Sequence, residues 1–129
     1  MKAKNYFPET ILAKIHEDRI LGIRSGTGTG HRVIGIWAVV VDGRVFVRSY
    51  TMKPRSWWRT LLEDPHGEIF VAKRKRGIKF RGVQVKNEKM KELVSAAYKD
   101  KYNTPGSIGY VEEMSQPPSR DTTTELMPI

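Results

Sequence analysis

The feature that most constrains the fold is a hairpin signal near the middle of the chain. Residues 33–41 read VIGIWAVVV, a run in which both alternating positions are apolar. A strand with this pattern is covered on both of its faces. The Asp42-Gly43 pair that follows favours a tight type I′ turn, and RVFVRSY at 44–50 alternates as a returning strand. The sequence therefore predicts an antiparallel hairpin whose first strand belongs to a barrel wall that is covered from outside.

Further strands and helices are expected on both sides of this hairpin. Apolar periodicity together with capping residues, prolines and glycines indicates where each element begins and ends. Ser56 is expected to cap the middle helix, and Asn87 the last one. The expected strands are 19–25, 67–74 and 78–85, and the expected helices are 8–18, 56–64 and 87–102.

Each of the two later helices shows a candidate apolar face. In the middle helix Trp57, Trp58, Leu61 and Leu62 share one side. In the last helix the predicted buried stripe is Met90, Leu93, Val94, Ala97, Tyr98 and Tyr102.

This order of elements predicts one α+β domain, residues 1–129, built on a small antiparallel barrel with about three helices. The N-terminal helix occupies 1–18, the barrel core 19–86 and an amphipathic helix 87–103. In the tail, 104–129, we expect GYVEEMSQPPSRD to be a loop and TTTELMPI to form a final strand.

Composition excludes several kinds of site. The chain has no cysteine, so it has no disulfide and no thiolate nucleophile or ligand. Its three histidines do not show a metal-ligand spacing, and no metal is expected. We find neither a secretory signal nor an apolar run of about 18 residues, and we expect a cytoplasmic protein without a membrane segment.

A net charge of +9 favours anionic partners, which include nucleic acids, anionic cofactors and phosphorylated substrates. The basic turn Ala72–Gly77 is the candidate nucleic-acid contact. The alternative is a solvated turn that discourages edge pairing, and we favour this alternative over nucleic-acid binding.

A glycine-rich segment, Gly26–Gly30, has a G-x-G-x-G pattern. It precedes a strand instead of opening a helix, which argues against a dinucleotide-binding loop. A connecting loop is the favoured interpretation, and a lid over a ligand is the alternative.

The strongest candidate site is RSYTMKPRSWW, residues 48–58. Arg48, Lys53 and Arg55 are expected to converge on the start of the tryptophan helix, where cations and unpaired amides would bind a phosphate. The adjoining tryptophans offer the flat apolar surface that a planar ring stacks against. In the alternative interpretation both indoles are buried in the core and the cations lie in water.

The apolar strand, the Asp-Gly turn, the Arg-Ser strand end and P-x-S-W-W-R-x-L-L-x-D-P together resemble the flavin-binding split-barrel superfamily. That superfamily includes pyridoxamine-phosphate oxidases and deazaflavin-dependent nitroreductases. Taken whole, including AAYKDKY and TTTELMPI, the chain is most similar to a bacterial family catalogued as a domain of unknown function.

The resemblance implies a six-stranded antiparallel split barrel that forms a homodimer and holds FMN or a deazaflavin at the subunit interface. Ile36, Trp37 and Ala38 would then lie along the flavin ring. The flavin would supply the redox chemistry, so no protein nucleophile is required. The residues that would hold the phosphate and ribityl parts are Arg48, Ser49, Tyr50, Lys53, Arg55, Ser56 and Trp57.

We therefore expect a flavin- or deazaflavin-binding oxidoreductase that acts on a small molecule. A non-catalytic ligand-binding or interaction protein on the same fold is the first alternative. A basic nucleic-acid-binding domain that uses residues 73–76 is the second.

Overall fold

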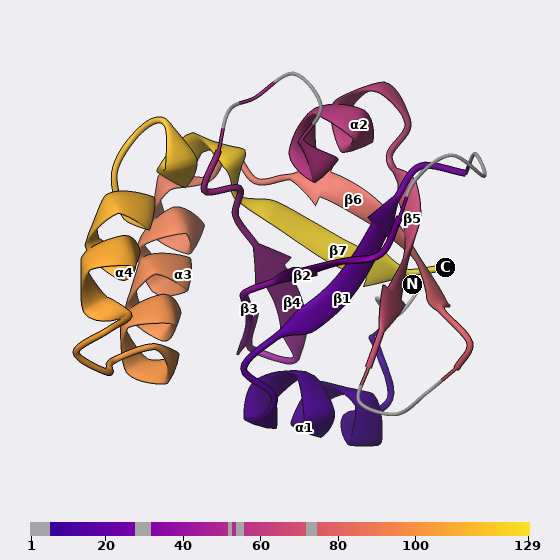
Figure 1. Ribbon diagram of the computed structural model, residues 1–129, viewed down its shortest axis with the longest axis horizontal. Coiled ribbons are helices and arrows are strands. Elements are labelled where there is room, and N and C mark those ends of the chain that lie inside the picture. The colour runs from indigo at the N-terminus through magenta and orange to yellow at the C-terminus, as the bar shows by residue number, and fades with distance from the viewer. Residues whose placement is uncertain (1–5, 28–31, 52, 54–55, 72–74) are drawn as a thin grey trace.

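A computed structural model describes residues 6–27, 32–51, 53, 56–71 and 75–129 (Figure 1). The part of the chain that it describes contains four α-helices, one short 3₁₀ helix and seven strands. The helices are α1 (Glu9–Glu17), α2 (Trp57–Glu63), α3 (Glu88–Lys101), α4 (Ile108–Met114) and η1 (Ser119–Thr122). The strands are β1 (Leu21–Ser25), β2 (Ile34–Ile36), β3 (Ala38–Val41), β4 (Arg44–Val47), β5 (His66–Phe70), β6 (Ile78–Gln84) and β7 (Thr124–Pro128).

The strands form one antiparallel sheet in the order β2-β1-β5-β6-β7-β4-β3. Its two outermost strands, β2 and β3, are consecutive in the chain and are separated only by Trp37. The sheet therefore curls until its edges meet through the chain itself, which makes a nearly closed barrel. The predicted α+β split barrel is confirmed, but the expected single strand 33–41 is divided in two at Trp37.

The Asp42-Gly43 hairpin is confirmed. Both residues have positive φ, 52° and 74° respectively, as a type I′ turn requires. Val41 faces Arg44 across the turn, and the ladder continues to the pair Ala38 and Val47. Glycine suits the second turn position because it adopts this conformation without steric cost.

The predicted final strand is also confirmed, and it has a central place in the sheet. Strand β7 lies between β6 and β4 and so joins the two halves of the barrel. The expected loop before it is wrong, because this segment contains α4 and η1.

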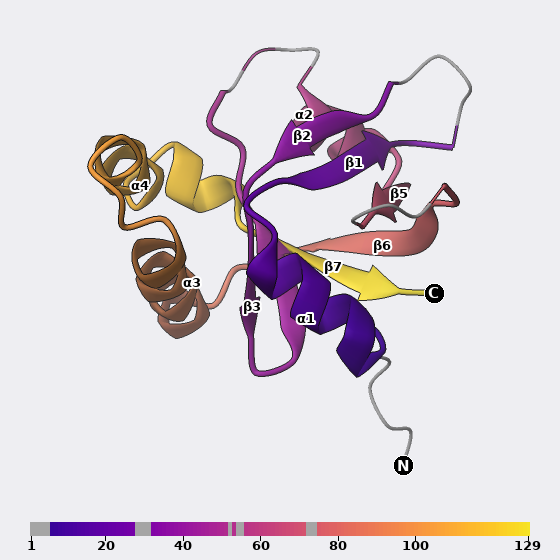
Figure 2. The same ribbon diagram turned by 60° about the horizontal axis from the view of Figure 1, so that its bottom comes forward.

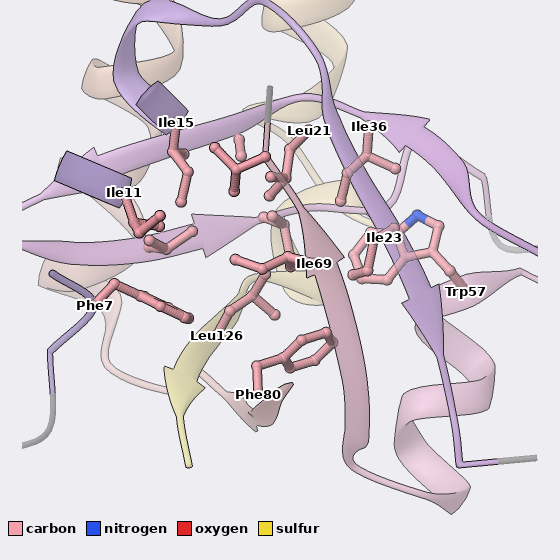
Figure 3. Close-up of a cluster of buried hydrophobic side chains, with 14 of the residues drawn as sticks. Phe7, Ile11, Ile15, Leu21, Ile23, Ile36, Trp57, Ile69, Phe80 and Leu126 are labelled. Atoms are coloured by element: carbon pink, nitrogen blue, oxygen red, sulfur yellow. The ribbon is translucent and has the colours of Figure 1, made fainter. Parts of the chain in front are cut away.

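The barrel interior is filled by apolar side chains, and α1 and α2 lie at opposite ends of the sheet (Figures 1 and 3). Ile11 and Ile15 enter the interior from α1, and Trp57 and Leu61 enter it from α2. Leu62, on the apolar side predicted for α2, is exposed.

A second apolar cluster lies outside the barrel, where α3 and α4 pack beside β3 and β4 (Figure 2). Val39 and Phe46 contribute from the strands, whereas Ala38, Val45 and Val47 face the interior. Strand β3 is thus covered on both sides, as predicted. The stripe predicted for α3 is wrong at Leu93, which is exposed, and Lys91 is buried instead.

Candidate functional site

A pocket of about 380 Å³ lies where the barrel wall meets the outer helices. Its volume is within the range of small-molecule sites, which are mostly apolar with a few polar groups. Four aromatic side chains contribute to its lining. The lining residues are Ile20, Ile34, Gly35, Ile36, Trp37, Arg48, Tyr50, Thr51, Trp57, Tyr110 and Met114.

Trp37 occupies the break between β2 and β3, and its ring is held by neighbouring aromatic rings. It stacks on Tyr102 with a centroid distance of 4.2 Å and an interplanar angle of 6°. Tyr110 meets it edge-on at 6.3 Å. Because these contacts restrain the indole, Trp37 offers the pocket a fixed flat wall.

Two tyrosines from different elements form the rim of the pocket. Tyr50 and Tyr110 contact each other edge-on at 5.5 Å, and each is about half exposed. The Tyr50 hydroxyl donates a 2.6 Å hydrogen bond to Glu113, and this bond raises the pKa of Tyr50.

Arg48 lines the pocket, but its guanidinium is committed to the protein. Although only 2% of the residue is exposed, every guanidinium nitrogen donates a hydrogen bond. Burial lowers the pKa of Arg48 to about 10. The acceptors are the Thr123 and Ser95 hydroxyls and the Met114 and Lys91 carbonyls, at 2.8–2.9 Å.

The expected convergence of three cations on a phosphate is therefore wrong for Arg48. Its guanidinium connects the end of β4 to α3, α4 and the segment before β7. Lys53 is exposed and follows pocket-lining Thr51 by two residues, and Arg55 lies outside the described residues.

Ser49 and Ser56 also have structural partners. Ser49 is fully buried, its amide donates to the Thr122 hydroxyl at 2.7 Å, and its hydroxyl donates to the Thr51 carbonyl. The Ser56 hydroxyl accepts a hydrogen bond from the Arg59 amide at 3.3 Å, which confirms the predicted cap of α2.

The remaining predicted site residues divide between the pocket and the barrel interior. Ile36 and Trp57 belong to both, because they contribute to the interior cluster and to the pocket lining. Ala38 is buried in the interior cluster and is not among the lining residues. The structure thus brings together Ile36, Trp37, Tyr50 and Trp57 at the pocket, with Arg48 behind it.

Sequence reasoning missed the contribution of α4. Tyr110 and Met114 line the pocket from this helix, in the segment predicted as a loop. The spacing of Ile108, Val111 and Met114 is a helical signal of the i, i+3 kind, but one that extends over only two turns. Ile20 and Ile34 were missed because nothing local shows that they lie beside the later helices.

The other candidate features lie elsewhere. Lys75 and Arg76 of the basic turn are exposed, and 72–74 lie outside the described residues. Most of the glycine-rich loop, 28–31, is likewise not described. Within the described ranges, no group of three metal-binding side chains comes together, and none of the helices has the length and apolar character needed to cross a membrane.

Fold and pocket together define a split-barrel protein with an aromatic-lined pocket between the barrel and its outer helical layer. The chain belongs to the family described as "Uncharacterized protein conserved in bacteria (DUF2255)", whose profile matches residues 11–126. A comparison with curated protein sequences gives no match.

Solved structures confirm the split-barrel relation at the level of the fold. The heme storage protein HutZ from Vibrio cholerae has a TM-score of 0.65 at 16% identity, over 94% of this chain and 89% of that one. A conserved hypothetical protein, Rv2991 from Mycobacterium tuberculosis, has a TM-score of 0.63 at 15% identity, over 100% and 84%. A FAD-binding protein from Mesorhizobium loti has a TM-score of 0.62 at 8% identity, over 100% and 94%.

Proposed function

We propose that this protein binds the ring of a flavin-type cofactor, FMN or a deazaflavin, in the aromatic pocket and acts as an oxidoreductase on a small molecule. The observation that carries the proposal is the pocket of about 380 Å³ whose wall is the restrained indole of Trp37. A planar heteroaromatic ring stacks on aromatic side chains and packs against aliphatic ones. The FAD-binding protein with the same fold supports this choice of ligand.

The pocket fits the ring of the cofactor better than its phosphate. Ile36, Trp37, Tyr50 and Trp57 line the pocket and are assigned to the ring and its ribityl side. Arg48 supports the pocket from behind and cannot contact a phosphate without losing bonds to the protein. Lys53 and Arg55 keep their predicted assignment to the phosphate, and because Lys53 is exposed we expect the phosphate to lie near solvent. When bound, the flavin accepts and returns electrons, and the protein positions the ring and excludes water.

We also propose that a second copy of the chain covers the pocket. Four apolar or aromatic pocket residues are 40–52% exposed, and this exposure gathers at one place on the surface. Patches of this kind on a soluble domain indicate an interface or a ligand site. The residues are Ile20, Ile34, Tyr50 and Tyr110.

Titration of the purified protein with FMN, riboflavin and a deazaflavin tests the ring assignment, with quenching of ligand fluorescence as the readout. Replacing Tyr110 by Ala should weaken binding about fivefold or more, because it removes one aromatic wall. Tyr6→Ala is the matched control, since Tyr6 is equally exposed, at 51%, but does not line this pocket. Similar affinity for FMN and riboflavin is expected because the phosphate lies near solvent.

The same preparation separates the alternatives. Failure of all three ligands to bind at tens of micromolar would contradict the proposal. Binding without transfer of electrons to or from the bound ring would support the non-catalytic alternative. For the second copy, light scattering should show that Ile34→Asp weakens self-association while Leu93→Asp, which changes an equally exposed residue on α3, does not.

A further inference from the structure

The break in the barrel wall at Trp37 leaves nearby backbone N–H and C=O groups without a strand partner. Ile36 pairs with Leu21 of β1, whereas Ala38 pairs with Val47 of β4. The chain therefore changes its partner strand at Trp37. Such a transition removes backbone groups from the ladder. Buried backbone groups nearly always find other partners, because leaving them unpaired costs free energy.

Side chains from the last turns of α3 satisfy these groups. The Tyr98 hydroxyl donates to the Trp37 carbonyl at 3.0 Å, and Lys101 Nζ donates to the Ala38 carbonyl at 2.7 Å. The Ala38 amide donates to the Tyr102 hydroxyl at 3.1 Å. Positions 98, 101 and 102 lie on one face of the helix by their i, i+3, i+4 spacing. This face of α3 therefore replaces the missing strand partner at the break.

Tyr102 does more than satisfy the backbone. Its hydroxyl also donates to the Arg19 carbonyl at 2.8 Å, so that it connects β3 to the segment before β1. Its ring lies nearly parallel to Trp37 on one side, and Tyr98 stacks at 5.8 Å with an interplanar angle of 28°. One residue thus fixes both the backbone next to Trp37 and the plane of its indole.

Arg19 makes cation–π contacts with both rings of the same stack. Its guanidinium carbon is 5.7 Å from the centroid of Trp37 and 5.4 Å from that of Tyr102. A cation at this distance is attracted to each of the two electron-rich rings and so stabilises the stack. The guanidinium Nη2 donates a hydrogen bond to the Ser107 hydroxyl, so the arginine is itself held in place.

We propose that Tyr102 is a positioning residue for the aromatic pocket, and that it sets the plane of Trp37 against which a planar ligand stacks. The inference rests on the proposed function only for the identity of the ligand. Tyr102 is not among the residues that line the pocket, so it acts through Trp37. A binding site whose wall is preorganised loses less entropy on association.

The test compares Tyr102→Phe with Tyr6→Phe, which changes an exposed tyrosine that does not line the pocket. The first variant keeps the stacked ring but removes the hydroxyl that bonds Ala38 and Arg19. The second removes a hydroxyl that has no hydrogen-bond partner in the described part of the chain. Two readouts are needed: the Trp37 indole N–H resonance in ligand-free protein, assigned with Trp37→Phe, and the affinity for riboflavin.

In Tyr102→Phe we expect the Trp37 resonance to move and broaden and riboflavin binding to weaken about fivefold, because the wall on which the ligand stacks is less preorganised. Tyr6→Phe should change neither. If Tyr102→Phe does not fold, nuclear Overhauser contacts between the Trp37 and Tyr102 rings in the ligand-free wild type replace it, because they report the stack directly.

The outcomes separate the two proposals. An unchanged Trp37 resonance in a folded Tyr102→Phe, or the absence of contacts between the two rings where that measurement is used, overturns the positioning role. If wild-type protein does not bind riboflavin, the flavin proposal fails, and the ligand-free Trp37 resonance alone decides the role of Tyr102.

Discussion

The two sides of the barrel wall are stabilised in different ways. Inside the barrel, the cluster to which α1 and α2 contribute is built from apolar side chains. Outside, under α3 and α4, the buried residues include Arg48, Tyr98, Tyr102 and several threonines, and these are joined by hydrogen bonds. Apolar packing is non-directional, whereas a hydrogen-bonded layer has a specific geometry. The pocket lies between the two, and its Trp37 wall is held from the hydrogen-bonded side by Tyr98 and Tyr102.

The largest expected effect is at Arg48. Arg48→Met leaves the acceptors from Lys91, Met114 and Thr123 without their donor, and we expect the free energy of unfolding to fall by about 3 kcal/mol. Arg48→Lys should not restore it, because a single ammonium cannot reproduce the fork of donors. Denaturant unfolding measures both variants.

The control for this prediction is Arg81→Met on β6, an exposed arginine that should change stability by less than about 0.5 kcal/mol. If Arg48→Met is as stable as this control, the hydrogen-bonded layer contributes little and the contrast between the two sides is lost.

Arg48 also shows what the sequence could not reveal. An arginine at a strand end, followed by other basic residues, is an ordinary signal for an anion site. Its real partners come from residues 91, 95, 114 and 123, which are distant in sequence and include two backbone carbonyls. Nothing local to residue 48 indicates them. The hairpin at Asp42-Gly43 was predictable because its cause is local, namely the positive φ of two adjacent residues.

The second prediction concerns pH and Lys101. Burial, assisted by the nearby Arg19 charge and opposed by that of Asp18, lowers the pKa of Lys101 from 10.5 to about 8. Between these two values the unfolded chain binds more protons than the folded one, so stability rises with pH. From pH 7.5 to 9.5 we expect a gain of about 1 kcal/mol in the free energy of unfolding, after allowance for screening by water.

This range stays below the region where tyrosines matter. Burial raises the pKa of Tyr102 to about 12 and also raises that of Tyr98, so both oppose folding only above pH 10, where unfolded tyrosines ionise. Lys101→Met should abolish the rise, whereas Lys99→Met, on an exposed position of the same helix, should keep it. A rise that persists in Lys101→Met would show that another group is responsible.

The third prediction is on the apolar side of the wall. The hydroxyl of Ser25 is buried and has no hydrogen-bond partner among the described residues. Ser25→Ala removes this uncompensated polar group, and we expect it to stabilise the fold by about 0.5–1 kcal/mol, measured as a higher melting temperature. Thr122→Ala on the other side should destabilise it, because that hydroxyl bonds the Ser49 amide and the Ser119 carbonyl. If both variants shift stability in the same direction, the two sides do not differ as described.

The errors in the predicted elements have a common physical cause. Leu62 and Leu93 are on helices with the correct period, but the layer that each helix packs against covers only part of the apolar face. The break at Trp37 is invisible in a continuous apolar run, because it depends on side chains from α3 that are about sixty residues away. The central place of β7 is likewise set by pairing with β4 and β6, which the local pattern of TTTELMPI does not contain.

The smallest expected effect distinguishes a cap from a phosphate ligand at Ser56. Its hydroxyl accepts one long hydrogen bond from the Arg59 amide, so Ser56→Ala should lower the free energy of unfolding by about 0.5 kcal/mol. If the hydroxyl only caps α2, then FMN and riboflavin should bind Ser56→Ala as tightly as they bind the wild type. A selective loss of FMN affinity would instead show that Ser56 contacts the phosphate. That result would support the assignment of Ser56 that was made from the sequence. Ser56→Gly completes the comparison, because glycine is tolerated at a cap but offers no hydroxyl. Its stability should approach that of the wild type, while its affinity for the two ligands should follow that of Ser56→Ala.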